Sequence, residues 1–201
     1  PSNSSAASDV YKRQIPERLQ EFLERNVEPT NLYLSLYATN QEDYERVTHP
    51  FIRNVFKRVV KSLETLKLFK KARTIIRLTM VKGLNMQHPE EFANLALKAN
   101  PWFIELKGFT WTGAAMHRLP RQAMPTMQEL NDFAKIISEV TGYEVKARDA
   151  YSRVVVMVRD QETWDKNLEL IKRQDEVIKQ KIGTADTSFN EKDFKLLHGK
   201  P

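Results

Sequence analysis

The stretch Arg73-Thr-Ile-Ile-Arg-Leu-Thr-Met-Val81 decides the fold class, because it is rich in β-branched residues and predicts a strand with two different faces. Successive side chains of a strand point to opposite faces of the sheet. One face is purely apolar and consists of Ile76, Leu78 and Met80. The other face is mixed and consists of Ile75, Arg77 and Thr79.

Two further runs repeat this alternation. Asn31–Tyr37 places Leu32, Leu34 and Leu36 opposite Tyr33, Ser35 and Tyr37. Phe103–Phe109 places Ile104 and Leu106 opposite Glu105 and Lys107. We therefore predict three strands that share one apolar face and one face with polar or charged side chains.

Helical patterns separate and follow these strands. Helices are expected over Ile15–Arg25, from Asn40 with Asp43, over Phe51–Leu68, Pro89–Lys98, Met127–Thr141 and about Trp164–Lys179. Thr126 and Glu129 form a capping-box pattern, and Gly142 can close that helix. Two more strand-like runs are Glu144–Arg148 and Arg153–Val158. Alternating strands and helices predict an α/β fold with parallel strands, either an open doubly wound sheet or a full or partial TIM-type barrel.

The polar strand face favours the barrel, because both faces of a fully covered parallel sheet should be apolar. A two-layer sheet with one hydrated face would give the same alternation. In a barrel the polar faces meet in the lumen, where Glu105 could neutralise Arg77 and Lys107. Ligands bind at the C-terminal ends of barrel strands. The residues expected there are Ser35, Tyr37, Thr79, Lys82, Asn85, Glu105, Lys107 and Thr110, and the alternative is a structural layer of salt bridges.

Composition limits the class of protein. The chain has 201 residues, of which 41% are hydrophobic, as in globular proteins. It has no apolar run near the roughly 20 residues that span a bilayer and no signal-peptide pattern, so a cytoplasmic protein is the default expectation. It begins with Pro1, and we expect the true start to be missing or processed, with 1–14 a disordered or non-native leader.

Cysteine is absent, which excludes disulfides and thiolate-held iron–sulfur or zinc sites within this chain. The four histidines are scattered, so no metal site is predicted. A net charge of +6 and a pI near 9.4 suggest a polyanionic partner such as nucleic acid, although a basic surface for solubility is the simpler alternative.

Several stretches, in order, resemble the radical-SAM tRNA 4-demethylwyosine synthases of the wybutosine pathway. They are Leu32-Tyr-Leu-Ser-Leu-Tyr-Ala38, Arg73-Thr-Ile-Ile-Arg-Leu-Thr-Met-Val-Lys-Gly-Leu-Asn-Met86 and Pro101-Trp-Phe-Ile-Glu-Leu-Lys-Gly108. The match continues with Arg118-Leu119, Met124-Pro125, Gly142-Tyr-Glu144 and Ser152-Arg-Val154. It covers about residues 26–179.

The resemblance implies a partial TIM barrel that binds S-adenosylmethionine and a 4Fe-4S cluster, which an electron donor reduces. The implied lyase reaction joins carbons from pyruvate to N1-methylguanosine in tRNA. On this basis we expect later barrel strands over 15–112, a wyosine base formation segment over 113–180 and a flexible tail over 181–201.

Two departures from the family pattern matter. The cysteine triplet C-x3-C-x2-C is absent, so this chain is expected to be inactive alone. Tyr37 stands where many relatives have an acidic residue, which weakens a ribose-binding role for that strand.

By position, Ser35, Thr79 and Asn85 are expected to contact S-adenosylmethionine. Lys82, Glu105 and Lys107 are expected on the pyruvate or base side, where the lysines supply positive charge for a carboxylate.

The connection Gly108–Arg121 is predicted to bind tRNA, with His117, Arg118 and Arg121 near phosphates and Trp111 stacked on a base. The alternative is that Trp111 packs the loop onto the barrel. The charged residues of the last helix are expected to form a solvated face.

Two other functions stay open. One is a TIM-type aldolase or lyase in which Lys82 or Lys107 acts directly on a keto acid. The other is a non-catalytic RNA-binding module.

Overall fold

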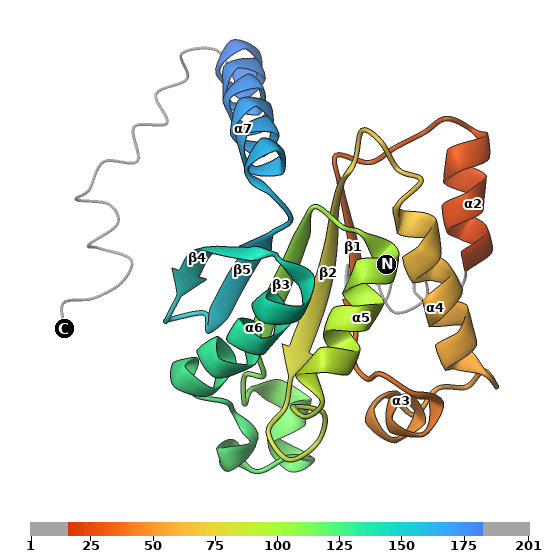
Figure 1. The fold of residues 1–201 in the computed structure, drawn as a ribbon, viewed down its shortest axis with the longest axis vertical. Helices are drawn as coiled ribbons and strands as arrows, with labels where there is room; N and C mark the ends of the chain where they lie inside the picture. Colours follow the sequence, from red (N-terminus) through yellow and green to blue (C-terminus); the bar gives the residue numbers. More distant parts are fainter. Residues whose placement is uncertain (1–15, 183–201) are drawn as a thin grey trace. The chain divides into compact units, whose positions relative to one another are not determined.

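A computed structural model of the chain describes residues 16–182, except for the side chains of 174 and 177–182. Its five strands form one sheet in the order β1-β2-β3-β5-β4 (Figure 1). The strands are β1 Asn31–Leu36, β2 Arg73–Met80, β3 Phe103–Gly108, β4 Glu144–Asp149 and β5 Val154–Val158. All five strand-like runs of the sequence are therefore strands.

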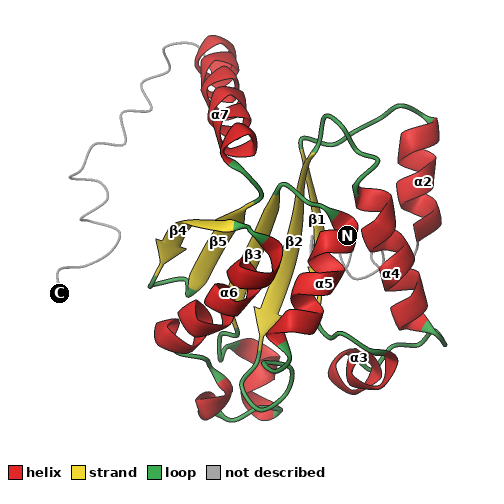
Figure 2. Ribbon diagram, viewed as in Figure 1, coloured by secondary structure: helices red, strands yellow, loops and turns green. Residues whose placement is uncertain are grey.

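Helices connect and flank the strands (Figure 2). They are α2 Pro16–Glu24, α3 Gln41–Thr48, α4 Val55–Leu66, α5 Pro89–Ala99, α6 Met127–Thr141 and α7 Gln161–Ile182, with short 3₁₀ helices η1 Gly113–His117 and η2 Arg121–Ala123. The capping box of Thr126 and Glu129 is present, and Gly142 ends α6 in the left-handed conformation. Asn40 caps α3 through Asp43 N, as predicted.

The predicted helix over Phe51–Leu68 was too long at its N-terminal end, because α4 begins at Val55. Asn54 has a φ of 54°, so its left-handed backbone interrupts the helix. The Phe51 side chain is fully exposed and supplies no packing that would extend the helix.

Strand direction divides the sheet into two parts. β1, β2 and β3 are parallel neighbours, as predicted. β5 is antiparallel to both β3 and β4, so the expectation of parallel strands throughout was wrong. The reason is the tight connection between β4 and β5, since a turn of a few residues can join only antiparallel neighbours.

The core lies between the sheet and the helices α4, α5 and α6 on one of its faces (Figure 1). The apolar strand face forms it, with the fully buried Ile76, Leu78, Met80, Ile104, Leu106, Val155 and Met157. The prediction that the apolar faces meet the helices is confirmed. The opposite face stays partly exposed, since Tyr33 keeps 40% of its accessible surface.

The chain divides into two compact units, and the boundary in the sequence lies between Trp164 and Asp165. The described part of the second unit continues α7. Its charged side chains that the structure describes are exposed, including the ion pair of Arg173 with Glu169, as predicted, while the side chains of Lys179 and Lys181 lie outside the description. The boundary expected near residue 112 stays a prediction. The predicted leader 1–14 and nearly all of the tail 181–201 lie outside the described residues. Between residues 16 and 182 no helix combines the length and apolarity needed to cross a bilayer.

A candidate binding site on the polar face of the sheet

The polar face carries a row of three side chains in register. Ser35 pairs with Arg77 across β1 and β2, and Arg77 pairs with Glu105 across β2 and β3. Directly opposed residues of neighbouring strands point to the same face. The sheet therefore brings together three polar residues that are far apart in the sequence, as the strand alternation predicted.

Arg77 and Glu105 form a two-pronged ion pair at the centre of this face. Arg77 Nε and Nη2 lie 2.9 and 3.1 Å from the two carboxylate oxygens of Glu105. The Arg77 guanidinium also lies 4.6 Å above the ring of Tyr33. Because Glu105 is only 9% exposed, its charge needs this partner. The prediction that Glu105 neutralises Arg77 is confirmed.

The same face is apolar at the opposite end of the strands. Ile75, Phe103 and Val158 are buried there as a separate cluster. The Trp164 ring meets Phe103 edge-on at 6.5 Å between centroids. The face thus changes from apolar at the N-terminal ends of the parallel strands to polar toward their C-terminal ends, where α/β proteins bind ligands.

Lys107 lies one row closer to the open end. It pairs with Thr79 of β2 and Val154 of β5, and Thr79 and Lys107 are half-buried. Across β5, Val154 pairs with Asp149. Hydrogen bonds from Ser152 lower the pKa of Asp149, and the positive charge of Lys107 adds to this effect. Lys107 is therefore within electrostatic reach of Asp149, and its predicted neutralisation by Glu105 stays a prediction.

Lys82 is directed elsewhere. Its Nζ lies 2.7 Å from Glu129 Oε1 at the N-terminus of α6, and its own amide donates to Ala123 O. The hydrogen bond from Lys82, followed by those from Thr126, lowers the pKa of Glu129. The ammonium is thus held in a capping network, and the expected role of Lys82 on the pyruvate side stays a prediction.

Of the three residues expected to contact S-adenosylmethionine, Ser35 and Thr79 lie on the polar face. Asn85 is buried and bonded to the backbone on both sides of its amide. Its Oδ1 accepts from Val81 N at 2.7 Å, and its Nδ2 donates to Tyr37 O at 2.8 Å and Thr79 O at 3.0 Å. These bonds tie the ends of β1 and β2 together and support a positioning role for Asn85.

Trp111 links the two ends of the connection that follows β3. Its ring Nε1 donates to Leu119 O at 2.7 Å, and its half-buried position supports the alternative that it packs the loop. His117 and Arg118 are exposed on and just after η1. Their predicted contacts with tRNA stay predictions.

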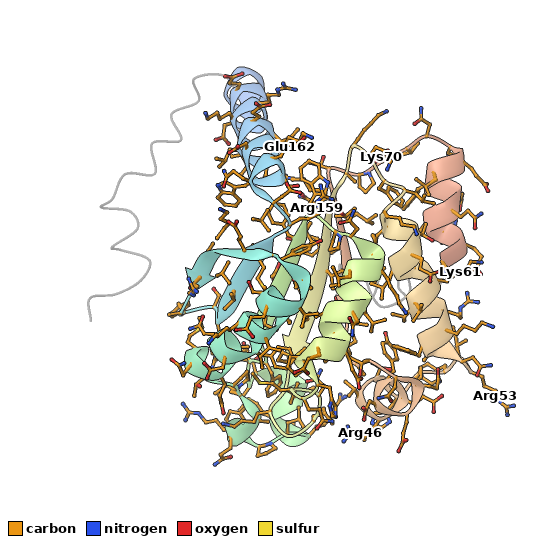
Figure 3. The ribbon with its side chains drawn as sticks, viewed as in Figure 1. Arg46, Arg53, Lys61, Lys70, Arg159 and Glu162 are labelled. Carbon is orange, nitrogen blue, oxygen red and sulfur yellow. The ribbon has the colours of Figure 1, made fainter. Side chains whose placement is uncertain are left out.

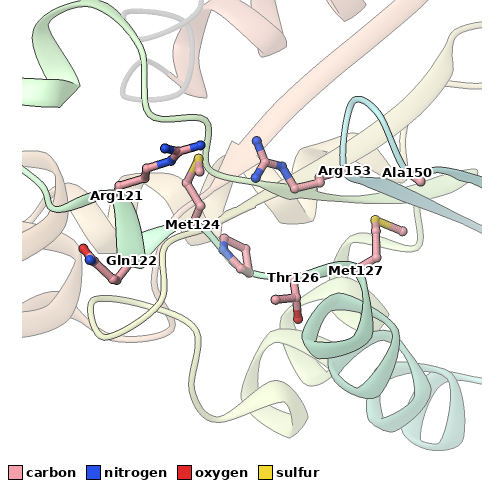
Figure 4. Close-up of a pocket in the computed structure, with 8 residues that line it drawn as sticks. Arg121, Gln122, Met124, Thr126, Met127, Ala150 and Arg153 are labelled. Carbon is pink, nitrogen blue, oxygen red and sulfur yellow. The ribbon is translucent and has the colours of Figure 1, made fainter. Parts of the chain in front are cut away.

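Arg121 lies beside a shallow hollow of about 470 Å³ between η2, the start of α6 and the β4–β5 turn (Figure 4). Arg153 lies on the other side of the hollow and was missed by the sequence reasoning. Arg153 lies in a short turn, where the sequence has no periodic pattern. Only its place directly before β5 could have indicated that it lies beside the candidate site.

Positive charge is also spread along α4 and the loops beside it, where Arg53, Lys57, Lys61, Lys67 and Lys70 are exposed (Figure 3). Within the described part of the chain, no three His, Asp or Glu side chains are grouped so that they could hold a metal ion. Because the sequence has no cysteine, its residues do not fit a thiolate-ligated 4Fe-4S cluster.

Comparison of the sequence with known proteins finds similarity to proteins that make wyosine bases. Residues 98–159 match the family described as Wyosine base formation. The chain is 39% identical over 152 residues to the S-adenosyl-L-methionine-dependent tRNA 4-demethylwyosine synthase of Pyrococcus horikoshii. That match covers 75% of this chain and 44% of the relative, so the chain spans less than half the length of this relative.

Solved structures agree. A structure of TYW1 with a lysine-pyruvate adduct bound is 29% identical, with a TM-score of 0.60 over 70% of this chain and 44% of that chain. Coproporphyrinogen III oxidase (HemN) from Escherichia coli, a radical SAM enzyme, is 16% identical, with a TM-score of 0.50 over 76% of this chain and 35% of that chain. The second likeness shows the fold alone.

Proposed function

We propose that this chain, whose residues 98–159 match the Wyosine base formation family, forms the C-terminal part of a tRNA 4-demethylwyosine synthase. The observation that carries the proposal is that the matched segment includes β3, α6, β4 and β5, three of the five strands of the sheet. Glu105, Lys107 and Arg153 all lie in this segment. The matched residues therefore line the hollow and contribute Glu105 and Lys107 to the polar face.

The two edges of the sheet support its place in a larger partial barrel. β4 has a bulge between Val145 and Ala147 and carries four charged residues, which are features that discourage further strand pairing. β1 forms the other edge, and its sequence Asn-Leu-Tyr-Leu-Ser-Leu has no charged residue. We infer that preceding strands pair with β1 and that the polar face then lines the lumen.

The proposed reaction is the lyase-type condensation of pyruvate carbons with N1-methylguanosine in tRNA. S-adenosylmethionine and a 4Fe-4S cluster with its electron donor would supply the radical chemistry in the complete enzyme, and this chain has no thiolate for the cluster. We therefore expect the chain to be inactive alone. A cytoplasmic location, where tRNA is available, belongs to the same proposal.

The chain's own residues would bind and orient the reactants. Thr79 is half-buried and would present its hydroxyl group to the polar parts of S-adenosylmethionine, and the buried Ser35 lies on the same face. The ion pair of Arg77 with Glu105 would hold these two side chains in place on the polar face of β2 and β3. Lys107 would hold the pyruvate carboxylate, since an ammonium on a half-buried surface attracts an anion more strongly than it does in water.

A chimera tests this proposal. The part of the Pyrococcus horikoshii relative that precedes the matched region is joined in front of β1, and the tRNA nucleosides are analysed by mass spectrometry after incubation with S-adenosylmethionine, pyruvate and a reductant. We expect 4-demethylwyosine from the chimera and none from the 201-residue chain alone.

The matched variants are Lys107→Ala, which should abolish product formation, and Lys98→Ala on the exposed surface of α5, which should retain it. Iron content and S-adenosylmethionine binding verify that each chimera is assembled. A fully assembled chimera that makes no 4-demethylwyosine would contradict the proposed function. A pyruvate adduct trapped by borohydride on Lys107 of the chain alone would favour the aldolase instead.

A further inference from the structure

The turn between β4 and β5 presents an aromatic side chain to solvent. Tyr151 is 98% exposed, although a tyrosine ring ordinarily covers apolar surface. The turn beneath it is ordered, because Asp149 Oδ1 accepts hydrogen bonds from Tyr151 N at 2.9 Å and Ser152 N at 3.1 Å. The backbone of the turn is thus fixed, and the Tyr151 ring extends from it into solvent.

Two arginines face each other next to this turn. Arg121 and Arg153 line the hollow from opposite sides, and Figure 4 shows their guanidinium groups turned toward one another across Met124. None of the residues that line the hollow is acidic. Arg153 Nε is shielded from solvent and has no hydrogen-bond partner among the residues that the structure describes. Two like charges directed into one hollow are stabilised by an anion between them.

The hollow adjoins the candidate site. Gly108 N donates to Arg153 O at 2.8 Å, directly after Lys107 on β3. A Cβ on Gly108 would lie 3.2 Å from Arg153 Cβ and equally close to Pro125 and Leu130, so the backbones approach one another closely here. Arg153 itself has a φ of 51°, a conformation that costs energy for a residue other than glycine and turns the chain back into β5.

We propose that this turn and hollow form a binding site for one nucleotide of single-stranded RNA. The Tyr151 ring stacks on a base that has left the stack of a tRNA loop, and Arg121 and Arg153 bind the phosphate of that nucleotide. Arginine binds phosphate through two parallel N–H groups, and aromatic rings accept any base face. The inference rests on the proposed function and adds a contact that orients the tRNA beside Lys107.

The test uses the 201-residue chain and an RNA stem-loop whose loop carries the fluorescent base 2-aminopurine next to the guanosine expected to be modified. Anisotropy measures binding, and quenching of 2-aminopurine reports stacking. Loss of one base–aromatic stack should weaken binding roughly 5- to 150-fold, so we expect this from Tyr151→Ala and Tyr151→Leu. Tyr151→Phe keeps the ring and should bind like the wild type.

Arg121→Gln tests the phosphate contact. It should weaken binding and reduce the slope of log K against log salt by about 0.7, because one fewer counterion is released from a single strand. Lys98→Gln removes an equal charge from the exposed surface of α5 and should leave the affinity within about twofold of the wild type. Circular dichroism verifies that every variant is folded.

The outcomes separate this inference from the proposed function. If the wild type binds the stem-loop with the expected salt dependence but Tyr151→Ala binds equally well and does not alter quenching, the site is refuted while the proposed function stands. If Tyr151→Leu retains full affinity, an apolar contact rather than stacking is at work, and the inference is again wrong. A wild-type chain that binds no RNA contradicts this inference, while the proposed function is still decided by product formation in the chimera.

Discussion

Asn85 shows at the scale of one residue how a buried side chain can position the strand ends that carry a candidate site. Its side chain makes three hydrogen bonds to the backbone at the ends of β1 and β2, and it is 3% exposed. Each of these backbone groups would lose its partner in Asn85→Ala. Because a buried group without a hydrogen bond costs about 1–3 kcal/mol, we expect the substitution to lower the free energy of unfolding by at least that amount.

Urea denaturation of Asn85→Ala measures this loss. The neighbouring Gln87→Ala serves as the control, since Gln87 is exposed and its truncation should change stability by less than about 0.5 kcal/mol. An Asn85→Ala chain as stable as the control, but with weaker S-adenosylmethionine binding in the chimera, would instead support the direct cofactor contact expected from the sequence.

At this scale the sequence predicted the residues whose place follows from strand alternation. Ser35, Arg77 and Glu105 share one face because parity is a local property of a strand. Asn85 and Trp111 bond to carbonyl groups of residues that a sequence pattern does not specify. Arg153 and Tyr151 lie in a turn, where no periodicity exists. The site was therefore predictable where it lies on strands and not where it lies on loops.

The first turn of α7 is an element whose stability should depend on pH. Asp160 Oδ1 accepts from Thr163 N at 2.7 Å, and its other oxygen lies 2.9 Å from Arg159 Nε. Partial burial raises the pKa of Asp160, but the hydrogen bonds of Thr163 and Arg159 outweigh it and lower this pKa from 3.8 to about 2. The ionised carboxylate is therefore the form that stabilises the helix start.

The sign of the pH effect follows from this lowered pKa. The stabilisation is fully present above pH 3.8, the ordinary value, and is lost as the pH falls toward 2. Asp160→Ala should cost about 0.5–2 kcal/mol at neutral pH through loss of the cap. Asp160→Asn can still accept a hydrogen bond, and it should remove the part of the acid dependence that Asp160 contributes.

Tryptophan fluorescence during urea unfolding at pH 7, 4 and 2.5 measures both effects, and Trp164 lies one turn from Asp160. The control is Asp132→Asn on the exposed surface of α6, which should unfold with the same pH dependence as the wild type. Identical pH profiles for Asp160→Asn and the wild type would show that the cap does not couple to stability.

Elements with strong local signals were predicted well. The capping box at Thr126 and the closing Gly142 fixed both ends of α6, because these signals act within one helical turn. The pairing of β5 with β3 was not predicted, since it depends on which strand edge is free when the β4–β5 hairpin folds back. The α/β fold class was predicted correctly. The sheet contains both parallel and antiparallel pairs because the β4–β5 hairpin packs against the edge of β3.

For the whole molecule, the unequal edges of the sheet predict how the isolated chain behaves. Among the described residues, the outer edge of β1 has no neighbouring strand and can pair with another chain, whereas β4 is protected by its bulge and charges. We expect the 201-residue chain to self-associate with increasing concentration. A charge on this edge should oppose association, and Tyr33 is suitable because it is 40% exposed and lies close to Arg77, which can balance a glutamate.

Sedimentation velocity across a concentration series should show Tyr33→Glu to be more monomeric than the wild type. Tyr151→Glu adds the same charge at the β4–β5 turn and should not change association, because that turn lies beside the protected edge strand β4, at the opposite side of the sheet order from β1. In the chimera, preceding strands would cover β1, so the wild-type sequence should be monomeric there as well. Equal association of both glutamate variants would mean that the β1 edge is not the contact, and the inferred continuation of the barrel at β1 would lose its physical support.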